Sequence, residues 1–279
     1  MTAFGPGPGH GHGAPSAAPP PPLAGSPGRG ATGGGPIRSP FVAVVEYTLR
    51  ACLPARRWFL LVALCFGAVL FGALTGVLDA PATRGFGDIA EQALFGLILP
   101  LTCLAIGDAV LGADVRAGTF QLTWLSPVPF WVIALGRWLG GWLVALVTLV
   151  PAMALAALVG GLPDAVGPMV IATAAGAAAY VALFLMLGVL VRRSAIWALA
   201  VVLIGERLVG SELSGVGQLS PMWEAEQAFA GLWEHGDRLL RDGMPSGNAG
   251  IVRLVLITAV CLGVATWRLG RMRPFSGDD

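Results

Sequence analysis

Lysine is absent from this chain of 279 residues, so all 17 of its basic residues are arginines. A Walker A phosphate loop needs a lysine that contacts the β- and γ-phosphates of the nucleotide. We therefore expect that the chain is not a conventional ATPase on its own. A Schiff base with pyridoxal phosphate, or any other lysine nucleophile, is excluded for the same reason.

Charge of either sign is also scarce. Only 12% of the residues are charged, against about 25% in an average soluble domain. The net charge of +1 offers no general basic surface for nucleic acid. By contrast, 56% of the residues are hydrophobic and the mean hydropathy is +0.76. This composition predicts a polytopic membrane protein embedded in a lipid bilayer.

Residues that carry enzyme chemistry are few. The 4 cysteines lie in or beside apolar stretches without a Cys-x-x-Cys pair, so we expect small hydrophobic residues and not disulfide partners or metal ligands. No Gly-x-Ser-x-Gly or His-Glu-x-x-His motif occurs, and His235 is the single histidine outside the N-terminal region. The sequence therefore predicts no enzymatic activity, no cofactor and no bound metal.

The N-terminal region differs in composition from the rest of the chain. Residues 1–39 are rich in glycine and proline, have few aliphatic residues and are expected to form a disordered cytoplasmic tail. Residues 40–54 instead carry apolar residues at helical spacing, but the stretch is too short to span a membrane. We expect an interfacial helix just before the first span, or alternatively a short loop that covers the bundle.

Six apolar stretches predict transmembrane helices, which makes the fold class all-α. The first, at 58–78, carries no charge and is long enough to cross about 30 Å of hydrocarbon. A polar loop is expected at 79–92, and the long third span is expected to tilt or to kink at Pro151. The glycine pairs Gly72/Gly76 and Gly136/Gly140 predict close helix packing. The spans are 58–78, 93–113, 131–159, 168–191, 194–209 and 251–267.

Arginine is distributed unevenly across this topology. With the N-terminus in the cytoplasm, more arginines fall on the inner side than on the outer side, as the positive-inside rule requires. We expect a multi-pass protein of the bacterial plasma membrane with both termini cytoplasmic, a transmembrane domain at 40–273 and a cytoplasmic tail at 274–279. The inner arginines are Arg56, Arg57, Arg116, Arg137, Arg192, Arg193, Arg268, Arg271 and Arg273, and the outer ones include Arg84, Arg238 and Arg241.

The outer segment at 210–250 has a helical pattern of its own. Ser220 followed by Pro221 is typical of an N-cap and a first helical position. Apolar residues, among them Phe229 and Trp233, then recur at helical spacing. An exposed soluble loop would not need these aromatic residues, so we expect one or two short helices in the outer leaflet before the last span.

Few ionisable residues lie at membrane depth. Asp108 lies near the inner end of the second span. It either contributes to a substrate path, pairs with an arginine, or is simply hydrated at the headgroup level. Glu206 and Arg207 either pair with neighbouring helices or mark the outer interface.

The most specific stretch is the inner segment between the second and third spans. It is a short, charged, amphipathic segment closed by a proline turn, with a basic residue that opens the next span. Such a segment is well placed to dock in a groove on a cytoplasmic partner and to transmit the partner's motion. The candidate site residues of this segment and of the start of the next span are Asp114, Arg116, Gly118, Thr119, Ser126, Pro127 and Arg137.

This arrangement resembles the permease subunits of ABC-2-type transporters. In that family an acid, a Gly-Thr pair, a few apolar residues, a Ser-Pro pair and a basic residue recur at this place. The family's acid is usually glutamate, so Asp114 is a departure. The resemblance covers about residues 40–273 and includes the six spans, the helix before the first span and the outer helices before the last.

The resemblance implies a permease subunit of an ATP-driven exporter of a small amphipathic molecule, drug or lipid. A separate ATP-binding subunit would supply the hydrolysis, and a second permease, identical or related, would complete the pore. The loop around Arg116 to Pro127 would couple the two kinds of subunit, with the helix at Phe41 to Leu53 as the elbow beside it. The alternatives are a secondary transporter driven by an ion gradient and a non-transporting membrane scaffold.

Overall fold

The computed structural model describes residues 39–52, 55–77, 81–112, 128–191, 200 and 219–271. All of these belong to one of the two units into which the chain divides, Arg38–Asp279. Four predicted features lie outside the described residues. They are the N-terminal tail up to residue 38, almost all of the fifth span at 194–209, the inner segment at 113–127 and the C-terminal tail at 274–279.

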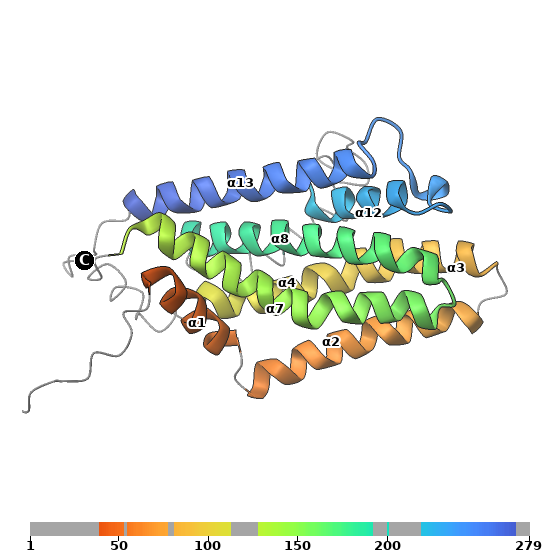
Figure 1. Ribbon diagram of the computed structural model, residues 1–279, viewed down its shortest axis with the longest axis horizontal. Coiled ribbons are helices and arrows are strands. Elements are labelled where there is room, and N and C mark those ends of the chain that lie inside the picture. The colour runs from red at the N-terminus through yellow and green to blue at the C-terminus, as the bar shows by residue number, and fades with distance from the viewer. Residues whose placement is uncertain are drawn as a thin grey trace, which may run out of the picture. The chain divides into compact units, whose positions relative to one another are not determined.

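Within the described ranges, all regular secondary structure is helical (Figure 1). The first elements are α1 (Pro40–Cys52), α2 (Ala55–Leu74) and the short η1 (Thr75–Val77). One continuous helical run then combines α3 (Ala82–Ile89), the π-helical η2 (Ala90–Ile98), α4 (Leu99–Gly107) and the π-helical η3 (Asp108–Gly112). The remaining elements are α7 (Phe130–Val159), η4 (Pro163–Ala165), α8 (Val166–Leu190), α12 (Pro221–Leu232), η6 (Asp237–Leu239) and α13 (Asn248–Arg271).

Four described helices are long and apolar enough to cross a membrane, which makes the chain a polytopic helical membrane protein. They match the second, third, fourth and sixth predicted spans. The first predicted span coincides with α2, whose apolar stretch Trp58–Leu74 is shorter than these four, so the total of six stays a prediction. The four are Ala82–Val110, Phe130–Val159, Pro163–Leu190 and Asn248–Arg271.

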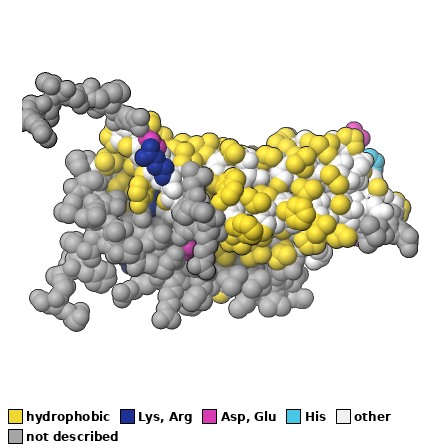
Figure 2. All heavy atoms as spheres, turned by 90° about the horizontal axis from the view of Figure 1, so that it is seen from below, with side chains coloured by type: hydrophobic (Ala, Val, Ile, Leu, Met, Phe, Trp, Pro, Cys, Tyr) yellow, Lys and Arg dark blue, Asp and Glu magenta, His cyan; other side chains and the backbone are white. Residues whose placement is uncertain are grey.

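The surface of the bundle is apolar, as a bilayer requires. Large hydrophobic side chains are exposed on α2, α7 and α13, among them Phe66 at 68%, Val147 at 74% and Val260 at 63% exposure. Figure 2 shows hydrophobic side chains covering much of one face of the molecule. In water these groups would be unfavourable, whereas lipid chains solvate them.

The polar loop predicted at 79–92 is wrong from residue 82 onward. The chain is helical from Ala82, so the second span belongs to a helix of 29 residues, Ala82–Val110. Arg84, Asp88 and Glu91 follow each other at helical spacing, while Gly85, Phe86 and Gly87 form the buried side. Clustered charges favour a loop. Here, however, the first turns of the helix are amphipathic, and the charged residues occupy their polar face.

The π-helical segment η2 has an identifiable cause in the sequence. Pro100 follows it at the beginning of α4. Proline has no N–H, so it cannot donate to the carbonyl four residues earlier, at Gly96. A π-helical turn is one way in which a helix absorbs such a missing bond.

Helix α7 packs against α1, α2 and α8, and glycines set its closest approaches to α1 and α2. A Cβ added to Gly136 would lie 2.9 Å from Val44 Cγ1, and one added to Gly140 would lie 2.7 Å from Thr48 Cβ, so α1 packs directly on α7. A Cβ on Gly72 of α2 would overlap the backbone of Ala156 in α7. The predicted close packing is confirmed for these three glycines and is wrong for Gly76, where a Cβ would meet nothing within 4 Å.

Helix α12 confirms the predicted cap. The Ser220 hydroxyl oxygen accepts a hydrogen bond from the Trp223 backbone N–H at 3.4 Å, and Pro221 is the first helical residue. The helix packs against α8, α13 and η2 at the end of the bundle that also holds α3 (Figure 1), here called the α12 end. Its aromatic residues join a cluster in which the Phe229 ring lies 5.5 Å from Phe95 and 5.3 Å from Trp233. Both α1 and α12 are therefore helices, while their depth in the membrane stays a prediction.

Candidate functional site

The structure describes two of the predicted site residues, Arg137 and Asp108. Arg137 lies on α7 and Asp108 opens η3. The other predicted residues lie outside the described residues: Asp114, Arg116, Gly118, Thr119, Ser126, Pro127, Glu206 and Arg207.

Arg137 of α7 connects three helices, since its side chain contacts both η3 and α1. Its side chain is buried, with 4% exposure. Nη1 donates a hydrogen bond of 2.6 Å to the Val110 carbonyl in η3, and the guanidinium lies over the Tyr47 ring of α1, 5.6 Å from its centroid. We call this contact set of Arg137, Val110 and Tyr47 the Arg137 junction.

The contacts of the Arg137 junction make it unfavourable for one of its three helices to move without the others. A buried guanidinium is costly unless its donors are satisfied. A hydrogen bond to a charged group contributes about 1.5–3 kcal/mol, and a cation over an aromatic ring adds about 1 kcal/mol. The Gly136 and Gly140 contacts hold α1 against the same part of α7. A displacement of η3 is therefore expected to move α1 and α7 with it.

Asp108 lies two residues before Val110 and is half-buried. Its side chain belongs to the same turn region as the acceptor of Arg137, and Asp108 has polar or electrostatic contacts of its own. The three predicted roles of Asp108, which are a substrate path, pairing with an arginine and hydration at the headgroup level, stay predictions.

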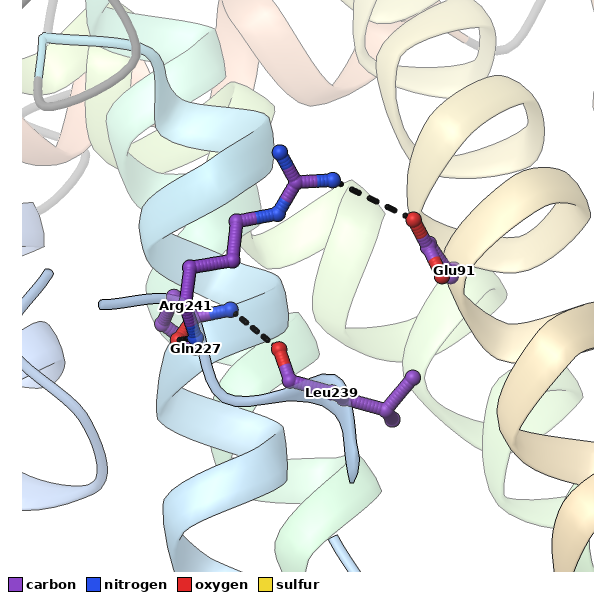
Figure 3. Close-up of polar contacts among 4 residues, drawn as sticks. All are labelled: Glu91, Gln227, Leu239 and Arg241. Carbon is purple, nitrogen blue, oxygen red and sulfur yellow. Dashed lines mark hydrogen bonds and ion pairs between the residues drawn. The ribbon is translucent and has the colours of Figure 1, made fainter. Parts of the chain in front are cut away.

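A second polar site lies at the α12 end and was not predicted. Figure 3 shows Arg241 reaching from the loop after η6 toward Glu91 of η2, with Nη2 3.2 Å from the carboxylate Oε1. Its guanidinium lies 3.6 Å from the centroid of the Trp223 ring. The Gln227 side chain accepts a 3.0 Å bond from the Arg241 N–H and donates a 2.7 Å bond to the Leu239 carbonyl. These contacts, here called the Arg241 cluster, hold the loop onto α12 and η2.

The contacts within the Arg241 cluster contribute unequally to the stability of the fold. The side chains of Arg241 and Glu91 are 34% and 25% exposed, so their ion pair contributes about 1 kcal/mol or less. The Gln227 amide is fully buried and bonded on both sides. Removing it would leave the Leu239 carbonyl and the Arg241 N–H without a partner, at about 1–3 kcal/mol for each buried group.

Two carboxyl groups on α12 are buried beside this cluster. Glu224 has no exposed area, and its Oε1 lies 3.3 Å from Arg253 Nη1 of α13. Burial raises the pKa of Glu224, and the Arg253 charge opposes that rise. Glu226 is 1% exposed, and neither of its carboxyl oxygens has a hydrogen-bond partner among the described residues. Burial, helped by the nearby Glu91 charge and opposed by Arg241, raises the pKa of Glu226 to about 8.

The burial of these two acids has no direct signal in the sequence. The helical pattern around Phe229 predicts one apolar face, and acids on a short helix are ordinarily placed on the opposite, hydrated face. Here α12 is covered on several sides, by α8, α13 and η2. The signal that was present is the cluster of large aromatic residues, which indicates a helix enclosed by neighbours and not one lying on a surface.

The described residues contain no arrangement typical of a metal centre. No three side chains of His, Cys, Asp or Glu come together in the described part of the chain as metal ligands would. The 4 cysteines are free thiols, and Cys52, Cys103 and Cys261 are buried. Neither a protein-family model nor a curated protein sequence matches the chain.

Proposed function

We propose that this chain is the permease subunit of an ATP-driven exporter of a small amphipathic molecule, drug or lipid. A separate ATP-binding subunit supplies the hydrolysis, and a second permease, identical or related, completes the transport path. The chain itself is not an enzyme. Its proposed location is the bacterial plasma membrane, with both termini in the cytoplasm.

The observation that supports this function best is the Arg137 junction. The segment 113–127 leaves the second span directly after η3 and returns to the chain just before α7. The junction joins those two elements to α1 through a buried arginine. A partner that docks on 113–127 and closes on ATP would push on one connected unit of three helices. Their tilt would then open the path through the membrane.

In this mechanism the predicted coupling residues of the inner segment have different roles. Arg116 and Asp114 provide charged contacts to the ATP-binding subunit, and Gly118-Thr119 allows a close backbone approach. Ser126-Pro127 turns the chain back into α7. Arg137 then transmits the displacement to α1 and η3. Asp108, Glu206 and Arg207 are left as candidates for intramembrane pairing or for the substrate path.

One observation favours a second candidate, a secondary transporter driven by a proton gradient. Glu226 is buried, its carboxyl group has no hydrogen-bond partner in the part of the chain that the structure describes, and it lies close to the charged Glu91 and Arg241. Carrier proteins use such carboxyl groups to bind and release protons. The two candidates separate on one variant: Glu226→Gln abolishes transport in a proton-driven carrier and leaves ATP-driven transport in place.

Replacing Arg116 by Ala, or Gly118-Thr119 by Val-Val, is expected to uncouple transport from ATP hydrolysis. Coupling between two sites has a free energy, to which each docking contact contributes. Loss of such a contact is therefore expected to lower the rate of ATP-dependent transport by about tenfold or more. The measurement compares ATP hydrolysis with efflux of a fluorescent amphipathic dye in proteoliposomes that contain both subunits. Glu234→Ala, which removes an exposed charge at the α12 end, is the control. Unchanged coupled efflux in the Arg116 and Gly118-Thr119 variants would contradict the proposal.

Cysteine labelling tests the orientation. In a background without the native cysteines, single cysteines at the exposed positions Arg84 and Glu234 are expected to react with a membrane-impermeant maleimide added outside intact cells. A cysteine at Arg192 is expected to react only after permeabilisation. The opposite pattern would reverse the topology and remove 113–127 from the cytoplasmic side.

A further inference from the structure

A polar pocket opens at the α12 end, apart from the Arg137 junction. It has a volume of about 210 Å³ and lies between the first turns of α3 and the loop that follows α12. Gly87, Trp233 and Leu239 form its buried floor. The Trp233 ring is fixed in place, because its Nε1 donates a 2.8 Å hydrogen bond to Asp164.

The charges around this pocket are of both signs. Two arginines, Arg84 and Arg238, and two carboxylates, Asp88 and Glu91, line it together with His235. Glu91 is already paired with Arg241. The side chains of Arg84, Asp88 and Arg238 form no ion pair within the described part of the chain. Three exposed charges of both signs are thus held around one cavity without neutralising each other.

The spacing of the charges suits a ligand that carries both signs. Arg84 and Asp88 lie four residues apart on one helix, which places their Cβ atoms about 5–6 Å apart on the same face. A basic residue placed before an acid is the less favourable order for an intrahelical pair, so both side chains stay available. A simple anion would leave Asp88 without a partner, and a simple cation would leave both arginines without one. A zwitterion supplies a group of opposite charge to each.

The length of the helix that lines the pocket favours a lipid headgroup as the zwitterion. The helix that carries these charges has 29 residues and is therefore about 44 Å long at 1.5 Å per residue. The hydrocarbon core takes up about 30 Å of it, and the polar headgroup layers take up the rest. Arg84, Asp88 and Glu91 lie in the first turns of this helix, where Trp233 supplies an aromatic side chain of the kind enriched at membrane interfaces.

We propose that this pocket binds the headgroup of a zwitterionic phospholipid, with the phosphate at Arg84 and Arg238 and the ammonium at Asp88. Guanidinium groups bind phosphate oxygens with charge-assisted hydrogen bonds, and a carboxylate accepts them from an ammonium. The site does not depend on ATP-driven transport. It would anchor the α12 end to the bilayer in a transporter of either class.

Native mass spectrometry of the full chain, purified in detergent and titrated with defined lipids, tests the site. The probes are phosphatidylethanolamine, phosphatidylglycerol, free phosphoethanolamine and inorganic phosphate. We expect phosphatidylethanolamine to bind about tenfold more tightly than phosphatidylglycerol, as the loss of one charged hydrogen-bonding group predicts. Free phosphoethanolamine should compete with the lipid, and inorganic phosphate should compete weakly.

Two sets of variants locate the binding. Gly87→Leu should fill the pocket and abolish the preference, since a Cβ there meets only Leu239 side-chain atoms, the nearest at 3.8 Å. Gly167→Leu is the matched control, because a Cβ at that position meets nothing within 4 Å. If Gly87→Leu does not fold, the surface variants Arg84→Gln and Asp88→Asn decide, each being expected to reduce the preference.

Three results would overturn the proposal. They are equal binding of the two lipids by the unaltered chain, binding of phosphatidylethanolamine to Gly87→Leu or to the charge variants at unaltered strength, and full competition by inorganic phosphate. The last of these would assign a plain anion site. None of them bears on the Arg137 junction or on ATP coupling.

Discussion

Replacing Gly72 by Val is expected to destabilise the protein by about 3 kcal/mol or more. A Cβ at Gly72 would overlap the Ala156 carbonyl group and would lie 2.6 Å from the Ala156 Cα. A flexible side chain can rotate away from such a contact, but helix backbone cannot, so α2 and α7 must separate. The expected measurement is a fall of about 10 °C in the detergent-solubilised melting temperature.

Gly76→Val is the matched control, one turn further along the same chain. A Cβ there would meet nothing within 4 Å, so we expect a change in melting temperature close to zero. Equal effects of the two substitutions would contradict the described packing of α2 on α7. Because the two glycines form one pair in the sequence, this comparison tests a difference that only the structure shows.

Glu226→Gln is expected to stabilise the protein at alkaline pH and to remove much of its pH dependence. The folded-state pKa is raised to about 8 from 4.5, so the folded protein keeps a proton that the unfolded chain releases between these values. The contribution of Glu226 to stability is therefore fully present below about pH 4.5 and is lost as the pH rises to about 8. Above pH 8 the buried, charged carboxylate lowers the stability of the natural chain by on the order of 5 kcal/mol.

The measurement is the melting temperature of both proteins between pH 5 and pH 9. We expect nearly equal values at pH 5 and an advantage of about 10 °C for Glu226→Gln at pH 9. Glu234→Gln is the matched control, because Glu234 follows α12 closely but is exposed. A constant difference between Glu226→Gln and the natural chain at all pH values would show that Glu226 is ionised throughout.

The sequence predicts the class of the fold because the requirement for apolar residues in a bilayer is directly visible as long apolar stretches. A bilayer requires long apolar helices, and four of the predicted stretches coincide with described helices that meet this requirement. The Ser220 cap is equally local, since a hydroxyl bonds a backbone N–H three residues ahead. Features that depend on one helix and its immediate neighbours along the chain can therefore be predicted from the sequence alone.

The features that could not be predicted depend on which other parts of the chain pack against a helix. Residues 82–92 look like a loop because Arg84, Asp88 and Glu91 are charged, yet Glu91 pairs with Arg241, 150 residues away in sequence. The same holds for Glu226, which is buried only because other helices enclose α12. The resemblance assigns Arg137 to coupling, but its hydrogen bond to the Val110 carbonyl depends on the packing of η3 against α7.

Purification of the chain from its native membranes in mild detergent, with mass spectrometry of the proteins that stay bound in fixed ratio, tests the proposed function most directly. We expect a soluble partner with a Walker A lysine, present at about one copy for each permease chain. Isolation of the chain without any ATP-binding protein, under conditions that keep a known ABC complex intact, would contradict the proposed function and would favour the proton-driven carrier.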